Sequence, residues 1–107
     1  MEAELFRLLD YRDVLCAVAS TQDGLVVASA GLSTDDAETV AAAGSSVVQT
    51  LAESGEQQST VDLAAGRLHV ALGDELMLLI LTESEVPSEA VGPVMVETLK
   101  NLDSSVA

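Results

Sequence analysis

The sequence predicts one α+β domain in the order helix, two strands, helix, three strands, helix, and three observations carry this prediction. An Asp23-Gly24 step separates two apolar runs, Val14 to Ser20 and Leu25 to Ala30, which is the usual signal of a β-hairpin. An alanine-rich segment from Asp35 to Glu53 has helical spacing of its apolar residues. The second half then contains three strand-like runs. A chain of 107 residues is long enough to bury the core of a single domain.

The first half is expected to begin with a short helix over Ala3 to Leu9 that turns leucines to one face. The run Val14 to Ser20 is apolar on both faces, which predicts a strand covered on both sides near the middle of the sheet. Gly24 would supply the positive φ of a type I′ turn. Ser33 or Thr34 is expected to cap the next helix, and Gly55 to end it.

The middle helix carries two stripes of apolar or small residues. The core stripe is expected to be Val40, Gly44, Val47 and Leu51, and a second stripe beside it is Ala41, Ser45, Val48 and Ala52. From Ala41 to Ser46 no side chain is larger than serine, so another backbone can approach closely. Such packing would offset the ~1 kcal/mol that a glycine in mid-helix costs relative to alanine.

The second half is expected to form strands over Gln58 to Ala64, Arg67 to Gly73 and Leu76 to Leu81. Two-residue turns at Ala65-Gly66 and Asp74-Glu75 would place Leu63 opposite Leu68, Asp62 opposite His69, and Leu72 opposite Met77. The last helix begins at Ser88 or near Gly92-Pro93 and runs to about Leu102, with Pro93 fitting best in the first turn. Its inward residues are Val91, Met95, Leu99 and Leu102, and Asp103 to Ala107 is expected to fray.

The composition restricts the partners that this chain can have. A net charge of −14 opposes nucleic-acid phosphates and anionic lipid, and 2% aromatic residues leave no platform for stacking bases. Basic or neutral partners are expected, although the acidity equally suits solubility or a salty cytoplasm. The single Cys16 excludes an internal disulfide, and the acidic start lacks the features of a signal peptide. We expect a cytoplasmic protein without membrane insertion.

The order of elements and apolar positions resembles the Roadblock (dynein light-chain) domain family over nearly the whole chain. The resemblance implies a five-stranded antiparallel sheet in order 2-1-5-4-3, with the middle helix on one face and the terminal helices on the other. The apolar runs Val14 to Ala19 and Leu76 to Leu81 would then be neighbouring inner strands. The family contains small dimeric modules that scaffold or regulate Ras-like GTPases, and some bacterial members partner the GTPase of gliding motility.

The resemblance also implies a homodimer. In the family, the middle helix and the third strand pair with their copies to make one continuous sheet. An edge strand that avoids pairing with another chain often contains proline or lysine. The strand Gln57 to Asp62 contains neither. The matching interface residues here are Ala41, Ser45, Val48, Ala52, Gln58, Thr60 and Asp62.

A nucleophile and base built from Cys16, His69 and Asp62 is not expected. In the strand order above, Cys16 and His69 lie two strands apart, about 9 to 10 Å, which is too far for a hydrogen bond. We predict a buried, inert Cys16 and a cross-strand pair of His69 with Asp62. Asp35 and Asp36 are interpreted as helix-start charges. No catalytic, cofactor or metal site is predicted, and the chain lacks the phosphate-binding loop of a GTPase.

The predicted function is that of a non-catalytic, dimeric interaction module that regulates or scaffolds a Ras-like small GTPase. The alternative is a structural adaptor, resembling a light chain, that leaves GTP turnover unchanged. A third hypothesis is an enzyme or small-ligand sensor of the related profilin-like fold. Arg12 and Arg67 are the arginines placed to act as a finger in trans, but the gliding-type members are thought to act without one.

Overall fold

Three helices and five strands follow one another in the predicted order. The computed structural model describes residues 2–11 and 13–106. The elements are α1 (Glu2–Leu8), β1 (Val14–Thr21), β2 (Val26–Ala30), α2 (Thr34–Ser54), β3 (Gln58–Leu63), β4 (Gly66–Leu72), β5 (Leu76–Thr82) and α3 (Ser88–Val106). None of these helices is both long enough and apolar enough to cross a membrane.

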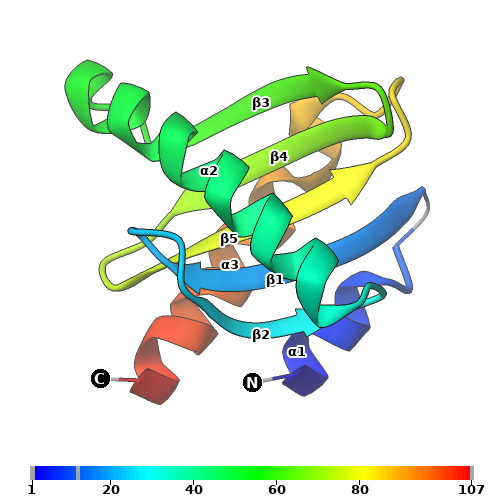
Figure 1. The fold of residues 1–107 in the computed structure, drawn as a ribbon, viewed down its shortest axis with the longest axis horizontal. Coiled ribbons are helices and arrows are strands. Elements are labelled where there is room, and N and C mark those ends of the chain that lie inside the picture. Colours follow the sequence, from blue (N-terminus) through cyan, green and yellow to red (C-terminus); the bar gives the residue numbers. More distant parts are fainter. Residues whose placement is uncertain (1, 12, 107) are drawn as a thin grey trace.

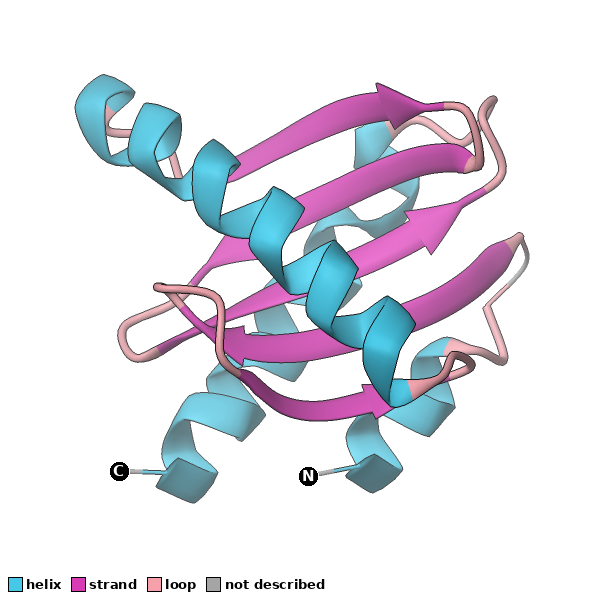
Figure 2. Cartoon of the chain, viewed as in Figure 1, coloured by secondary structure: helices cyan, strands magenta, loops and turns pink. Residues whose placement is uncertain are grey.

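The strands form one antiparallel sheet in the order β2-β1-β5-β4-β3, as predicted. Helix α2 runs diagonally across one face, and α1 and α3 cover the other (Figures 1 and 2). The two continuous apolar runs are therefore the paired inner strands β1 and β5, which need apolar side chains on both faces.

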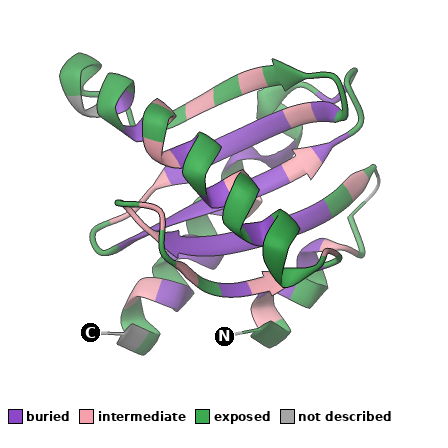
Figure 3. Ribbon diagram, in the orientation of Figure 1, coloured by how far each residue is buried: buried purple, intermediate pink, exposed green. Residues whose placement is uncertain are grey.

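The alternation of side chains along the strands divides the core into two layers. The layer under α2 contains Val18, Leu68, Val70, Met77 and Leu79, together with Ala37, Ala41, Val48 and Leu51 of the helix. The layer under α1 and α3 contains Ala17, Ala19, Leu78 and Ile80, together with Leu5, Leu8, Val91, Met95, Leu99 and Leu102 of those helices. Figure 3 shows that burial is concentrated on the inner strands, while α2 is largely exposed on its outer side.

The turn of the first hairpin differs from the prediction. Gly24 N donates to Thr21 O at 3.0 Å, and Thr21 N donates to Leu25 O at 2.8 Å, so the loop has three residues. Gly24 has φ +96°, whereas Asp13 is the one non-glycine residue with positive φ among those described. A type I′ turn needs positive φ at both central residues, so that prediction was wrong. Gly24 instead provides the left-handed last position of the three-residue loop.

Strand β2 contains a bulge close to its start. Ala19 lies opposite Ala28, whereas Ser20 lies opposite Val26, so Val27 is an extra residue in the ladder. Val27 is 44% exposed. A bulge of this kind bends and twists an edge strand.

The register of β3 against β4 is two residues away from the predicted one. Leu63 lies opposite Gly66, and Asp62 lies opposite Arg67, whereas β4 and β5 pair as predicted, with Leu72 opposite Met77. Gly66 is not a turn residue, because it begins β4 with φ +148°. A Cβ atom there would lie closer than 3.0 Å to the carbonyl oxygen of Thr82 on β5. Close approach of two strands, not turn chemistry, thus requires this glycine.

Helix α3 has the earlier of its two predicted starts, and it continues past the predicted end near Leu102. It begins at Ser88, so Pro93 lies inside the helix and not in its first turn. The end expected to fray from Asp103 is helical to Val106. The Asp103 carboxylate accepts hydrogen bonds from the backbone N–H groups of residues 74, 75 and 76, at 3.0, 3.3 and 3.1 Å. These bonds join the end of α3 to the turn between β4 and β5.

Candidate functional site

Helix α2 carries most of the predicted interface residues. Ser33 Oγ accepts from Asp36 N at 3.2 Å at its start, and Gly55 ends it in a left-handed conformation, both as predicted. A Cβ atom on Gly44 would lie closer than 3.0 Å to a methyl group of Leu79. The small residues therefore allow α2 to lie directly on its own sheet.

The side of α2 that faces the sheet falls between the two predicted stripes. Ala41 and Val48, from the second stripe, are buried in the layer under α2, while Val40 and Val47, from the core stripe, are half-buried at its margin. Ser45 is half-buried and its hydroxyl donates to Ala42 O at 3.0 Å. Ala52 lies outside the residues whose side chains the structure describes.

The outer face of α2 offers uncharged and mostly short side chains to solvent. Ala42, Ala43, Ser46, Gln49 and Thr50 are all exposed, and we call them the α2 outer face. Helical spacing did not predict them, because a run of alanine and serine has little hydrophobic contrast between its sides. The available signal was the absence of any side chain larger than serine from Ala41 to Ser46.

Strand β3 forms one edge of the sheet, and β4 is its only neighbour among the described strands. Gln58, Thr60 and Asp62, the three predicted interface residues of this strand, are exposed. The C-terminal end of α2 leads into β3, so α2 crosses the sheet and reaches its free edge (Figure 1). This edge presents backbone groups that a further strand can pair with.

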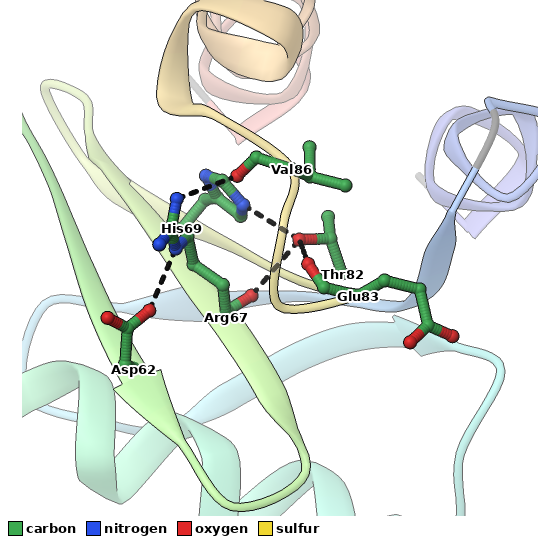
Figure 4. Close-up of polar contacts among 6 residues, drawn as sticks. All are labelled: Asp62, Arg67, His69, Thr82, Glu83 and Val86. Atoms are coloured by element: carbon green, nitrogen blue, oxygen red, sulfur yellow. Dashed lines mark hydrogen bonds and ion pairs between the residues drawn. The ribbon is translucent and has the colours of Figure 1, made fainter.

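A polar cluster lies between β3, β4, β5 and the segment before α3 (Figure 4). Arg67 Nε donates to Asp62 Oδ1 at 2.8 Å, and Arg67 Nη1 donates to Val86 O at 3.0 Å. His69 contacts Thr82 instead, with 2.9 Å between Nε2 and Oγ1. The predicted pair of His69 with Asp62 was therefore wrong, because the shifted register places Asp62 opposite Arg67 and Thr60 opposite His69.

The surroundings of His69 favour its neutral form. The side chain is only 2% exposed. Burial lowers the pKa of His69, and the nearby Arg67 charge lowers this pKa further, against a smaller opposing effect of Asp62. The Arg67 guanidinium binds both the Asp62 carboxylate and the backbone carbonyl of Val86, so this candidate arginine finger is part of a structural cluster. Arg12, the other candidate, lies outside the described residues.

Cys16 is buried on β1, as predicted, and burial raises the pKa of its thiol. It lies opposite Leu81, whose side chain packs under α2, while His69 lies opposite Ile80 in the layer under α1 and α3. The two side chains are thus on opposite faces of the sheet, two strands apart. Asp35 and Asp36 lie in the first turn of α2, and residues 2–11 and 13–106 contain no group of three metal-ligating side chains.

The fold of this chain is that of Roadblock/LC7 domains. A Roadblock/LC7 domain from Streptomyces avermitilis superposes with a TM-score of 0.85 at 24% identity, over 99% of this chain and 97% of that one. A second Roadblock/LC7 domain from that organism gives 0.77 at 28% identity, over 94% and 95% of the two chains.

A further similar structure is MglB of Myxococcus xanthus. It superposes with a TM-score of 0.77 at 16% identity, over 98% of this chain and 93% of that one. No family model matches this sequence, and no curated protein sequence does. The resemblance to Roadblock domains is confirmed, and the chain has the Roadblock/LC7 fold along almost its entire length.

Proposed function

We propose that this chain is a non-catalytic, cytoplasmic homodimer that binds a Ras-like small GTPase and regulates its nucleotide cycle. The observation that carries the proposal is the free β3 edge together with an α2 outer face of uncharged, mostly short side chains, in a fold shared with Roadblock/LC7 domains and MglB. A solvated helix of a monomer would be expected to carry long charged side chains there. The acidic surface suits a partner with a basic face.

In the proposed dimer, β3 pairs with its own copy across a two-fold axis. Gln58, Thr60 and Asp62 would then lie beside the copy's strand, and Ser45 with the α2 outer face would lie near the axis. Ala41 and Val48 support this contact from beneath, because they hold α2 against the sheet. A two-fold operator brings equivalent residues together, so each substitution near the axis acts twice.

The dimer can be tested with Ser46→Arg, which adds a long charged side chain to the exposed centre of α2. We expect sedimentation to show a dimer for the unmodified chain and a monomer for this variant. Ser105→Arg is the matched control, because Ser105 is equally an exposed helical serine but lies on α3. A monomeric unmodified chain at high micromolar concentration would reject the dimer.

Regulation of the GTPase would be conformational. The paired α2 helices would offer a surface to the switch region and stabilise one of its states. A partner shifts such an equilibrium only by the difference between its affinities for the two states. Since Arg67 already binds Asp62 and Val86, we expect Arg67→Ala to leave any stimulation of GTP turnover intact.

The decisive experiment titrates a candidate Ras-like small GTPase with this chain, the GTPase being loaded first with GDP and then with a non-hydrolysable GTP analogue. We expect one nucleotide state to bind more tightly, GTP turnover to change when the chain is present, and association to slow as salt rises. Equal affinities with unchanged turnover would leave the structural adaptor as the function. No binding in either state would reject the regulation of this GTPase.

A further inference from the structure

His69 is buried in surroundings that suit only its neutral ring. The Thr82 hydroxyl has a single proton, and Glu83 O at 2.9 Å and Arg67 O at 3.4 Å are the acceptors for it. Thr82 Oγ1 then accepts from His69 Nε2, which places the proton of the neutral ring on Nε2. His69 Nδ1 is fully buried and has no hydrogen-bond partner among the described residues. Protonation would add a second N–H at Nδ1, a charged donor without an acceptor, which is costly to bury.

The charges around His69 do not offset this cost. The charged side chains on the elements around it are Glu56 ahead of β3, Asp62 on β3, Arg67 on β4, Glu83 and Glu85 before α3, and Glu89 in the first turn of α3. Asp62 already accepts from Arg67, and the Arg67 charge opposes a second positive charge nearby. Glu56, Glu85 and Glu89 are exposed, and Figure 4 shows the Glu83 carboxylate pointing away from the ring. A protonated ring would therefore gain chiefly from contact with water.

Residues 83–92 form the wall beside His69 on the side of α3. They lead from the end of β5 through the first turn of α3, and Figure 4 shows this segment passing beside the ring. Hydrogen bonds join the segment to its neighbours: Arg67 Nη1 donates to Val86 O at 3.0 Å, Glu83 N to Asp13 O at 3.0 Å, and Gln58 Nε2 to Gly92 O at 3.2 Å. Val86 and Val91 are buried in the layer under α1 and α3. These contacts hold segment 83–92 closed while the ring is neutral.

The end of this segment has the features of a hinge. Pro93 lies inside α3 and has no N–H, so the Glu89 carbonyl lacks the helical hydrogen bond that would join the first turn to the second. Gly92 precedes it, and glycine has the least restricted backbone. A polar cavity of about 370 Å³ adjoins the segment and is lined by His69, Ser88 and Gly92, among others. This volume is many times the ~30 Å³ of one water molecule, so a small movement of the segment would admit water to Nδ1.

We propose that protonation of His69 releases segment 83–92 from the sheet, with Gly92-Pro93 as the hinge. In the released state, both N–H groups of the charged ring would donate to water. His69 is the one histidine of the chain, and histidine is the side chain whose ordinary pKa lies between pH 5 and 8. The α3 side of β3 and β4 would thus open as the pH falls through that range. The release does not depend on the proposed GTPase partner, because every moving group belongs to one chain.

Hydrogen exchange followed by NMR measures the release. The N–H of Glu83 loses its bond to Asp13 O on release, whereas Val18 and Leu79 belong to inner strands that stay paired. The released ring takes up a proton with the ordinary pKa of about 6.5 and the closed ring does not, so the open fraction rises about tenfold from about pH 7.5 to about pH 5.5. We expect this rise for Glu83, after correction for the intrinsic pH dependence of exchange. The inner strands should exchange more slowly at both pH values.

Variants separate the role of the proton from that of the hinge. His69→Gln can retain the donor to Thr82 but takes up no proton, so its open fraction should be the same at both pH values. His69→Asn is a second variant without a titrating ring and gives the same comparison where His69→Gln is unstable. Pro93→Ala supplies an N–H for the Glu89 carbonyl, so it should open less at both pH values and keep the same relative rise.

Three results would overturn the proposal. The first is an unmodified chain whose open fraction does not rise, and the second is an equal rise in His69→Gln. The third is equal exchange of Glu83 and the inner strands at the lower pH, because the whole domain then unfolds and no segment is released. An unchanged open fraction in Pro93→Ala would overturn the hinge.

Discussion

Replacing Gly66 by alanine tests the packing of β4 against β5. Gly66 has φ +148°, a conformation that L-residues rarely adopt, and a Cβ atom there would lie closer than 3.0 Å to Thr82 O and 3.3 Å from Thr82 C. These are backbone atoms of a paired inner strand, so they cannot rotate away as a side chain can. The two strands must separate locally, or the ladder must break.

The expected loss follows from two separate effects. An L-residue held at positive φ costs ~1–2 kcal/mol, and overpacking against atoms that cannot move costs ~1–3 kcal/mol more. We therefore expect Gly66→Ala to lower the free energy of unfolding by about 3 kcal/mol, out of the ~5–15 kcal/mol typical of a domain. Gly55→Ala is the matched control, because Gly55 has φ +77° but nothing within 4 Å of an added Cβ. It should lose only ~1 kcal/mol.

Urea unfolding of both variants measures the difference. Protein concentration must be the same in each experiment, since the stability of the proposed dimer would depend on it. The slope of the free energy of unfolding against urea should be unchanged, which shows that the same surface is exposed on unfolding. Equal losses of unfolding free energy for Gly66→Ala and Gly55→Ala would refute the close approach of Gly66 to Thr82. They would also refute the observed pairing of the start of β4 with the end of β5.

Three further predictions concern groups that the fold buries or employs. Because burial lowers the pKa of His69, the unfolded chain binds a proton at higher pH than the folded chain, so stability should decrease as pH falls below about 6.5, and less so in His69→Gln. Cys16 should react slowly with an aromatic disulfide reagent in native buffer and quickly in denaturant, and rapid native labelling would contradict its burial. Asp103→Ala should lower the free energy of unfolding by ~1–3 kcal/mol, because three backbone N–H groups lose their acceptor; the control Asn101→Ala, at an exposed position of α3, should change little.

The sequence predicted those parts of the fold that depend on local pattern. The continuous apolar run of β5 could only be a strand covered on both faces, and the Asp74-Glu75 turn fixed Leu72 opposite Met77. The register of β3 was missed because Gly66 looks like a turn residue until Thr82 of the neighbouring strand is seen to approach it. That contact joins residues distant in sequence, and no local pattern reports it.

The candidate site was predicted less completely than the fold. Alanine and serine differ little in hydrophobicity, so helical spacing alone did not show that Ala41 and Val48 face the sheet while Ala42 and Ser46 face solvent. The partner of His69 was also missed. The register of β3 against β4 places Asp62 opposite Arg67, and the bond to Thr82 joins residues of β4 and β5 that are not directly opposite each other. Side-chain partners across a sheet are sensitive to each register between them.

The bulge in β2 has a consequence for how many copies can join. Two chains paired through β3 would leave a β2 strand at each outer margin, and a regular margin would recruit further chains into an open-ended fibre. The extra residue Val27 breaks the even spacing of backbone donors and acceptors at that margin. In the proposed dimer, growth by strand addition would therefore stop at two chains, and the irregularity that distorts one hairpin would limit the size of the assembly.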